Sequence, residues 1–198
     1  PRIAHTFNLR FDDYGRVLQS VVVVYPRRAR FADDSLTAQQ QELIRAVQAE
    51  RHISYTEARF TDERPPHRRH HRLPLPCEVR TYELTGDDTQ GFRPSAPVYF
   101  SAADFRAFKL SDHLPNQGVK PVLRLDYHEQ PASRAAHMRL VEHVRSLYWD
   151  DGSDTAPPSV QLAFGQHGPR GLKYEDYKLA MTNGLLGAVF ATADAMSN

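Results

Sequence analysis

Cysteine is almost absent from this chain, whose 198 residues include only Cys77. A single thiol excludes an internal disulfide and any zinc site built from several cysteines. An excess of charge is also absent, since 25 Lys and Arg residues face 24 Asp and Glu residues. Net charge of +1 does not favour non-specific binding to nucleic acid. Apolar runs stay well below the roughly 20 residues of a transmembrane helix, so we expect no membrane span.

The common catalytic motifs are missing as well. The sequence contains neither a Gly-x-Ser-x-Gly elbow nor a His-Glu-x-x-His metal helix. The glycine-rich stretch 165–171 lacks the Lys-Ser/Thr ending of a phosphate loop and the spacing of a dinucleotide fingerprint, so we interpret it as a flexible connector. Cys77, between Pro76 and Glu78, has no neighbour that would activate it as a nucleophile. These gaps leave no recognised catalytic or cofactor-binding motif, and we expect no cofactor.

What the sequence does contain begins with a hairpin. Residues 5–11 alternate apolar and polar side chains, so that Phe7, Leu9 and Phe11 share one face. Residues 12–15 form a turn signal that ends in Gly15, and residues 16–26 run back with many β-branched side chains. The composition, 40% hydrophobic and 25% charged, is that of an ordinary globular protein.

Helix signals follow the hairpin. Thr37 with Gln40 three residues later is a capping-box pattern, and Ser101 with Asp104 marks a second helix start. Apolar residues from Met138 to Tyr148 recur at helical spacing. We therefore expect helices over residues 36–52, 101–109, 133–149 and 174–190, the last of them broken near Asn183.

Strand signals complete the pattern, at residues 53–60, 77–84, 122–128 and, briefly, 160–164; the proline-containing stretch 92–99 reads as an extended or edge segment. The predicted fold class is α+β, with antiparallel hairpins and a sheet packed against three to four helices. We expect a single fragment over 1–198: hairpin and helix in 1–60, a loop rich in Pro, His and Arg in 62–76, strands and helices in 77–198. The chain starts at Pro1 and goes straight into strand pattern, so we expect it to be cut from a longer protein.

Several polar groups are candidates for chemistry. The loop from His67 to Arg72 could bind a metal through His67 and His70, form a patch for an anion or nucleic acid, or be a solvated basic loop. Asp126, His128 and Glu129 could carry out acid–base chemistry or form a salt-bridged outer face, which Arg124 would join. His137 and His143 lie six residues apart on the predicted helix, so they are no ligand pair, and we expect His137 to be packed and hydrogen-bonded.

Large aromatic side chains are the remaining candidates. Tyr82, Phe105 and Phe108 belong to a core or, alternatively, to an interface that an excised fragment would expose. The residues that we predict for an interface or shell surface are Tyr14, Arg16, Tyr25, Tyr82, Phe105 and Phe108.

A family resemblance rests on several of these segments. The run from Asp13 to Val17 resembles the hairpin unit of Rhs/YD-repeat proteins. The other segments are residues 16–19 with 25–28, 73–86, 123–127, 147–149 and 174–180. In their order and spacing they are similar to the middle-to-C-terminal region of the TcdB/SpvB-like B component of bacterial insecticidal toxin complexes (Tc toxins).

The resemblance implies a mechanical function. It implies a secreted virulence protein that is the B component of a toxin complex. In this family the B component joins a C component in a hollow Rhs-repeat shell around a toxic effector. The shell docks on a pore-forming A component, which translocates the effector. No catalytic residue belongs to this stretch of the family. Two alternatives come from the residues: a metal-dependent hydrolase using His67, His70, His128 or nearby carboxylates, and a sugar or host-surface binding module. The binding module would use exposed Tyr99, Phe100 and Phe105.

Overall fold

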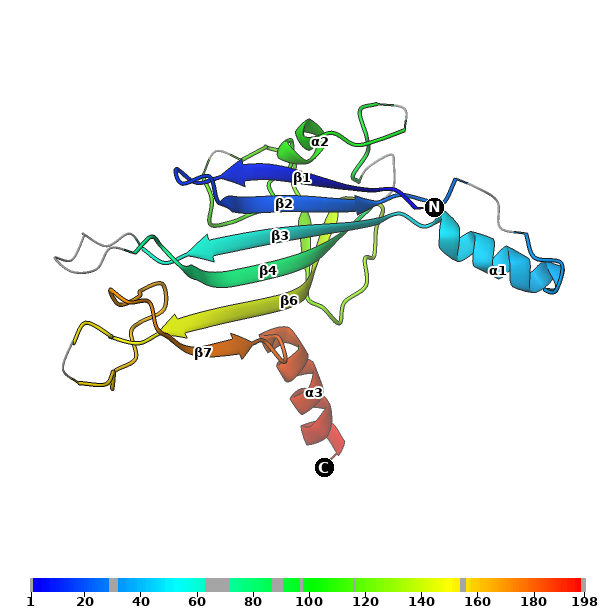
Figure 1. The fold of residues 1–198 in the computed structure, drawn as a ribbon. Helices are drawn as coiled ribbons and strands as arrows, with labels where there is room; N and C mark the ends of the chain where they lie inside the picture. Colours follow the sequence, from blue (N-terminus) through cyan, green and yellow to red (C-terminus); the bar gives the residue numbers. More distant parts are fainter. Residues whose placement is uncertain are drawn as a thin grey trace. The chain divides into compact units, whose positions relative to one another are not determined.

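The computed structural model describes residues 2–28, 32–62, 72–86, 91–96, 98–115, 117–153 and 156–196, with side chains through residue 190. Figure 1 shows the order of the elements. They are β1 (Ala4–Phe11), β2 (Val17–Val24), α1 (Ala38–Ala49), β3 (His52–Phe60), β4 (Pro76–Thr85), α2 (Ala102–Arg106), β5 (Leu123–Leu125), β6 (His137–Tyr148), β7 (Lys173–Lys178) and α3 (Asn183–Met196).

The strands pair in the order β1-β2-β3-β4-β6-β5, and β7 pairs with β6. The hairpin β1–β2 and the pair β6–β7 are antiparallel, whereas β5 runs parallel to the first residues of β6. The predicted α+β class is therefore correct only in part, because the described chain is dominated by a mostly antiparallel sheet and one of its three helices, α2, has five residues. None of the described helices is both long and apolar enough to cross a membrane.

Two compact units divide the chain. Unit 1 is made of Pro1–Tyr55, Glu83–Leu125 and Gln130–Arg139, and unit 2 of Thr56–Tyr82, Asp126–Glu129 and Leu140–Asn198. The strands β3, β4 and β6 each give residues to both units. This division does not follow the predicted segments, and the single-fragment organisation stays a prediction. Most of the predicted basic loop, including His67 and His70, lies outside the described residues.

Unit 1 is built on the predicted hairpin. Gly15 has a φ of +76°, a left-handed conformation that favours glycine, and it closes the turn between β1 and β2. The Asp12 carboxylate accepts hydrogen bonds from the backbone N–H groups of Tyr14 and Arg16, each at 2.9 Å. The β2 side chains Val21 and Val23 are fully buried. Local turn chemistry and an alternating face thus formed the hairpin that the sequence predicted.

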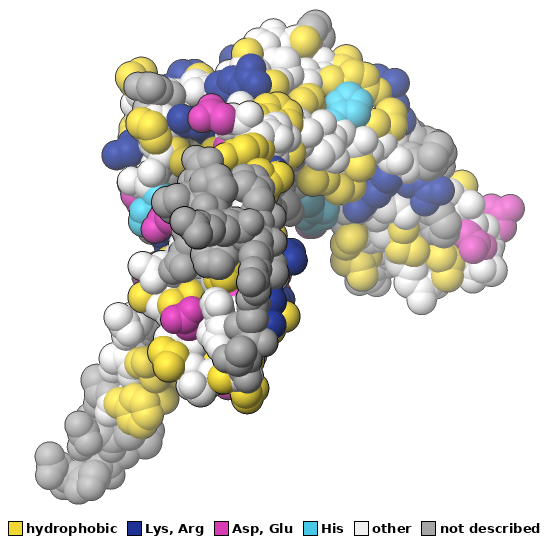
Figure 2. All heavy atoms as spheres, turned by 60° about the vertical axis from the view of Figure 1, so that its left-hand side comes forward, with side chains coloured by type: hydrophobic (Ala, Val, Ile, Leu, Met, Phe, Trp, Pro, Cys, Tyr) yellow, Lys and Arg dark blue, Asp and Glu magenta, His cyan; other side chains and the backbone are white. Residues whose placement is uncertain are grey.

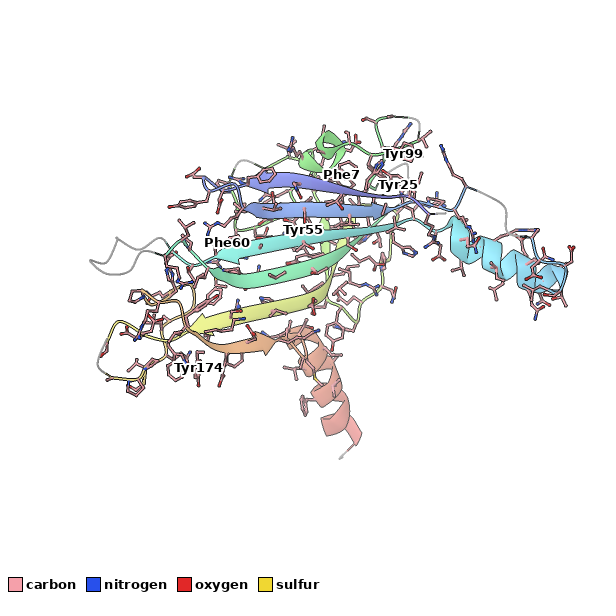
Figure 3. All side chains as sticks on the ribbon, viewed as in Figure 1. Phe7, Tyr25, Tyr55, Phe60, Tyr99 and Tyr174 are labelled. Carbon is pink, nitrogen blue, oxygen red and sulfur yellow. The ribbon has the colours of Figure 1, made fainter. Side chains whose placement is uncertain are left out.

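An aromatic cluster packs in the same unit (Figure 3). The rings of Tyr25 and Tyr99 meet edge to face with centroids 5.0 Å apart, and Phe7 lies 5.8 Å from Phe105. Phe105 projects from α2, whose predicted start is confirmed because Asp104 accepts hydrogen bonds from the backbone N–H and hydroxyl of Ser101. The helix ends at Arg106, three residues before the predicted end.

The predicted helix over 133–149 is wrong, since β6 (His137–Tyr148) occupies that stretch. In unit 2, β6 pairs with β7 in the register Val144↔Lys178 and Arg145↔Tyr177. This pairing gives the backbone of β6 hydrogen-bond partners that an isolated sequence cannot display, and it overrides the helical spacing of the apolar residues.

The predicted helix over 174–190 is wrong in its first half, which is β7, whereas Asn183 marks the start of α3 and not a break. Helix α1 carries the predicted capping box between Thr37 and Gln40, and the strands β3 and β4 confirm the predictions at 53–60 and 77–84. The strand expected over 122–128 is reduced to β5, and the one expected over 160–164 to an isolated bridge between Trp149 and Gln161.

Candidate functional site

A buried carboxylate, that of Glu78, is the centre of the densest polar cluster in unit 2. Its side chain is 2% exposed. Its Oε1 atom lies 2.6 Å from His143 Nε2, 2.7 Å from Arg145 Nε and 3.1 Å from Arg80 Nη2. Its Oε2 atom lies 3.6 Å from Arg59 Nη1. One acidic group is therefore shared by three guanidinium groups and one imidazole, which we call the Glu78 cluster.

The strand period explains why these side chains meet. Glu78 and Arg80 are two residues apart on β4, and His143 and Arg145 are two apart on β6, so each pair projects from one face of its strand. Arg59 comes from β3, which precedes β4 in the strand order. Side chains opposite one another on adjacent strands are close enough for ion pairs. The cluster thus links three strands through a single carboxylate.

The electrostatics fix Glu78 in its charged form. Burial alone would raise the pKa of its carboxyl, but hydrogen bonds from Arg145 and His143 and the charge of Arg80 outweigh it and lower the pKa to about 2. Glu78 in turn raises the pKa of Arg80 against the effect of burial. His143 Nε2 has two polar neighbours, the Glu78 carboxylate at 2.6 Å and Arg80 Nε at 3.4 Å. Because the contact with the carboxylate is much the shorter, we assign the hydrogen to His143 Nε2, which donates it to Glu78.

This arrangement is unsuited to proton transfer near neutral pH. A general acid or base works best when its pKa is close to the operating pH, and Glu78 is far below that range. The cluster instead holds arginine side chains in fixed positions. Arg59 and Arg145 both stack on the ring of Phe164, with guanidinium carbons 5.3 and 4.7 Å from the ring centroid. Their side chains stay 41% and 46% exposed, so both present positive charge to solvent.

A groove of about 490 Å³ adjoins this cluster. Its lining consists of His143, Arg145, Tyr177, Lys178, Leu179, Ala180, Met181 and Leu186. Arg145 and Tyr177 are directly paired across β6 and β7, so their side chains share a face of the sheet. Hydrophobic side chains of the neighbouring helix α3 are open to solvent (Figure 2), with Val189 48% and Phe190 62% exposed.

The glycine-rich stretch 165–171 is packed, contrary to the prediction of a flexible connector. His167 is 1% exposed, and its Nδ1 lies 2.7 Å from the Thr61 hydroxyl. The buried Asp151 carboxylate accepts hydrogen bonds from the backbone N–H groups of Arg170 at 3.0 Å and Leu172 at 2.7 Å. A Cβ atom at Gly168 would overlap this carboxylate. The glycines here allow a close approach of backbone to a buried acid, which is a structural role.

The six predicted interface residues divide by burial. Tyr25, Tyr82, Phe105 and Phe108 are all less than 9% exposed, so in this chain they belong to the core. The Tyr25 hydroxyl also accepts a hydrogen bond from the backbone N–H of Phe100 at 2.9 Å. Tyr14 is 44% exposed, and Arg16 pairs with Asp12 at 2.6 Å. For all six residues, contact with another chain stays a prediction.

Arg124 does not join Asp126, His128 and Glu129 in the expected salt-bridged face. Arg124 pairs with Asp112, Nε to Oδ2 at 3.0 Å. The Glu129 carboxylate accepts a hydrogen bond from the backbone N–H of Asp126 at 2.8 Å, which closes a local turn. Among the described residues, no group of three or more His, Cys, Asp and Glu side chains could hold a metal ion.

Other single-residue predictions have mixed outcomes. His137 is confirmed as a packed histidine, 3% exposed with Nδ1 2.8 Å from the Ala135 carbonyl, although it lies on a strand and its spacing from His143 is no longer helical. Burial raises the pKa of the Cys77 thiol to about 11, which opposes reactivity. The exposed aromatic surface expected for sugar binding is wrong for Phe100 and Phe105, which are 5% and 0% exposed.

Sequence reasoning missed the Glu78 cluster. The available signal was two polar pairs at a spacing of two, Glu78 with Arg80 and His143 with Arg145. The second pair was hidden because its strand had been assigned to a helix.

Comparison with known proteins finds a matching family model for part of the chain and solved structures with a similar fold. Residues 1–72 match the family model described as the insecticide toxin TcdB middle/C-terminal region. The solved structure "Crystal Structure of TcdB2-TccC3" matches the fold over 100% of this chain, with a TM-score of 0.57 and 16% sequence identity. The structure "Crystal Structure of TcdB2-TccC3-Cdc42" matches over 95%, with a TM-score of 0.50 and 15% identity.

The extent of these matches sets their meaning. The chain spans 8% of the length of each of these two solved chains. No curated protein matches it. At these identities the solved structures show a similar fold and nothing more. The family model shows a sequence similarity that is limited to residues 1–72. Together, these comparisons show that residues 1–72 are similar to the TcdB middle/C-terminal region and that the chain shares its fold with a part of the chain solved as TcdB2-TccC3.

Proposed function

We propose that this chain is a non-enzymatic wall segment of a toxin shell. In this proposal it lies within a larger secreted B component, which together with a TccC-type C component encloses a toxic effector and hands it to a pore-forming A component. The observation that carries the proposal is the long, mostly antiparallel sheet whose fold matches a part of the chain solved as TcdB2-TccC3.

The physical properties of the chain support a wall. A shell needs strands that stay paired over a long distance, and the strands β1, β2, β3, β4 and β6 have eight to twelve residues each. The Glu78 cluster keeps its carboxylate ionised near neutral pH, which suits cross-linking of strands better than turnover. A buried polar cluster whose members all have partners also favours one strand register over others.

The test is co-expression of the parent protein with a TccC-type partner. We expect the two to co-purify as one large particle, within which the effector region of the partner resists added protease. The wild-type protein is compared with Val21→Asp, which places a charge in the fully buried core of β2, and with Val141→Asp, whose position is 59% exposed. Burying an unpaired charge costs several kcal/mol, so the first variant should lose the particle and the second should keep it.

Three outcomes would refute the proposal. One is that parent and partner behave as independent monomers although both fold. Another is that the effector region is digested equally fast with and without the parent protein. The third is catalytic turnover by the purified chain that a single polar substitution abolishes.

A further inference from the structure

The groove beside β7 combines an apolar floor with cationic side chains. Its apolar members are Leu179, Ala180, Met181 and Leu186, together with the ring of Tyr177. Leu179, Met181 and Tyr177 are 41%, 47% and 48% exposed. Exposed apolar side chains that gather in one concave place mark a contact site more often than scattered ones do. The volume of about 490 Å³ is enough for several side chains of a ligand.

Every charged side chain in the lining is cationic or can become so: His143, Arg145 and Lys178. Of these, Arg145 is the best positioned. Its Nε donates to Glu78 at 2.7 Å and its guanidinium stacks on Phe164, so the group is held in one orientation. Its two terminal nitrogens make no hydrogen bond to any described residue. A guanidinium fixed by one edge can still bind a carboxylate through the pair of terminal N–H groups, and such a pair is strong and directional.

Binding of an anion at Arg145 would not disrupt the Glu78 cluster. Glu78 keeps its contacts with His143, Arg80 and Arg59. Since three guanidinium groups surround one carboxylate, an added negative charge balances an existing excess of positive charge. The cluster is therefore a preformed partner for a carboxylate.

The open edge of β7 indicates that the ligand is a peptide. In the described part of the chain, β7 pairs with β6 only. The Leu179 N–H donates to the His143 carbonyl, so by alternation Tyr177 bonds toward β6 while the backbone groups of Asp176 and Lys178 point outward. A strand added there would project alternate side chains onto the face that holds Tyr177 and the groove.

The edge of β1 differs, because it is already covered. Arg106 donates to the Leu9 carbonyl at 3.1 Å, and Arg10 donates to the Pro115 carbonyl. Side-chain contacts of this kind hinder the pairing of a further strand at β1. The edge of β7 is the one that borders the groove.

We propose that the groove between β7 and the start of α3 binds an extended segment of a partner protein in which aliphatic residues alternate with Glu or Asp. In this mode the aliphatic side chains cover Leu179, Met181 and Leu186, and one carboxylate pairs with the terminal nitrogens of Arg145. The apolar floor favours such a peptide over a free inorganic anion, which would leave the floor exposed to water. The inference does not depend on the proposed shell function.

The probe is a capped peptide that alternates leucine or valine with glutamate, titrated into the full chain and followed by fluorescence anisotropy. Two comparison peptides replace the glutamates with lysine and the aliphatic residues with serine. We expect binding of the first peptide alone. Arg145→Gln should weaken it about tenfold or more, since hydrogen bonds between charged groups contribute roughly 1.5–3 kcal/mol.

The matched control is Lys173→Gln. It removes the same charge from the same unit, at a 53% exposed residue outside the groove lining, so binding should change about twofold or less. Leu186→Asp places a carboxylate in the groove from a partly exposed helix position, and it should weaken binding about tenfold without affecting the cluster. This second variant keeps the test valid if Arg145→Gln disturbs folding, which circular dichroism would reveal.

Four results would overturn the proposal. The first is no binding of the acidic–aliphatic peptide by the folded chain. The second is equal weakening by Arg145→Gln and Lys173→Gln, which would indicate bulk charge. The third is equal binding of the serine peptide or full competition by inorganic phosphate, which would indicate a simple anion site. The fourth is unchanged binding to Leu186→Asp.

Discussion

Replacing Glu78 with Gln tests whether the cluster stabilises unit 2 by its charge. The carboxyl has an ordinary pKa of 4.5 and a folded pKa of about 2, a difference that corresponds to about 3 kcal/mol. Because the folded pKa is the lower one, this contribution is fully present above pH 4.5 and is lost as the pH falls toward 2. Glu78→Gln should therefore lower the free energy of unfolding by about 3 kcal/mol at pH 7.

The pH dependence is the sharper part of this prediction. A protonated Glu78 resembles Gln in shape and charge, so the gap between the wild type and Glu78→Gln should shrink steadily below pH 4.5 and nearly vanish near pH 2. Urea unfolding followed by tryptophan fluorescence measures it. The single tryptophan, Trp149, lies in unit 2 and contacts the Tyr174 ring at 4.5 Å, so its emission reports the unit that contains the cluster.

Glu142→Gln is the control for this experiment. Glu142 pairs with Lys178 at 2.5 Å, but their side chains are 41% and 67% exposed. Exposed ion pairs contribute about 1 kcal/mol or less, so this variant should be nearly as stable as the wild type. The reasoning fails if the gap for Glu78→Gln is the same at low and neutral pH, or if Glu142→Gln costs as much.

Three further predictions concern packing and reactivity. Phe105→Ala should lower the free energy of unfolding by about 3–5 kcal/mol because the ring is fully buried. Phe11→Ala, at a 49% exposed residue, should change it by about 0.5 kcal/mol, and urea unfolding compares the two variants. Gly118→Ala should lower the melting temperature because its Cβ would overlap neighbouring backbone, while Gly187→Ala, with nothing near its Cβ, should stabilise α3 by up to about 1 kcal/mol. The Cys77 thiol should react with iodoacetamide at pH 8 far more slowly in the folded chain than in urea, and equal rates would contradict its burial.

The parts of the fold that the sequence predicted correctly are those with local chemical signals. The hairpin was predicted because Gly15 supplies a left-handed turn residue between two alternating runs. The starts of α1 and α2 were predicted because Thr37 and Ser101 precede residues, Gln40 and Asp104, that complete a capping box. Each of these signals lies within a few residues and does not require knowledge of distant partners.

The strand β6 was mistaken for a helix because two apolar residues, Val141 and Leu147, interrupt the alternation of a strand. Met138 and Tyr148 are buried on the same face, as a strand requires. Val141, however, projects to the other face and is 59% exposed. Counted as a buried residue, Val141 completes a helical spacing with Met138 and Val144. Periodicity analysis assumes that apolar residues are buried, and this assumption failed at an open face.

The strand β7 was missed for a related reason. Five of its six residues are exposed, so neither face shows the alternation of a half-buried strand. Its charges are those of a strand exposed to solvent: Lys173 pairs with Asp176 at 3.1 Å. Both features depend on the position of β7 in the sheet, which the sequence does not display.

The sequence prediction missed the Glu78 cluster because it assigned β6 to a helix. On a helix, His143 and Arg145 would point about 200° apart and could not share one acid, whereas on β6 they project side by side. Glu78 alone on its strand reads as an ordinary polar residue. The site exists because the sheet brings a single acid between cations from two neighbouring strands, and it leaves one of these cations, Arg145, oriented but half exposed. The Glu78 carboxylate binds side chains of neighbouring strands, and the Arg145 guanidinium stays accessible to solvent. This arrangement suits contact with another chain better than catalysis.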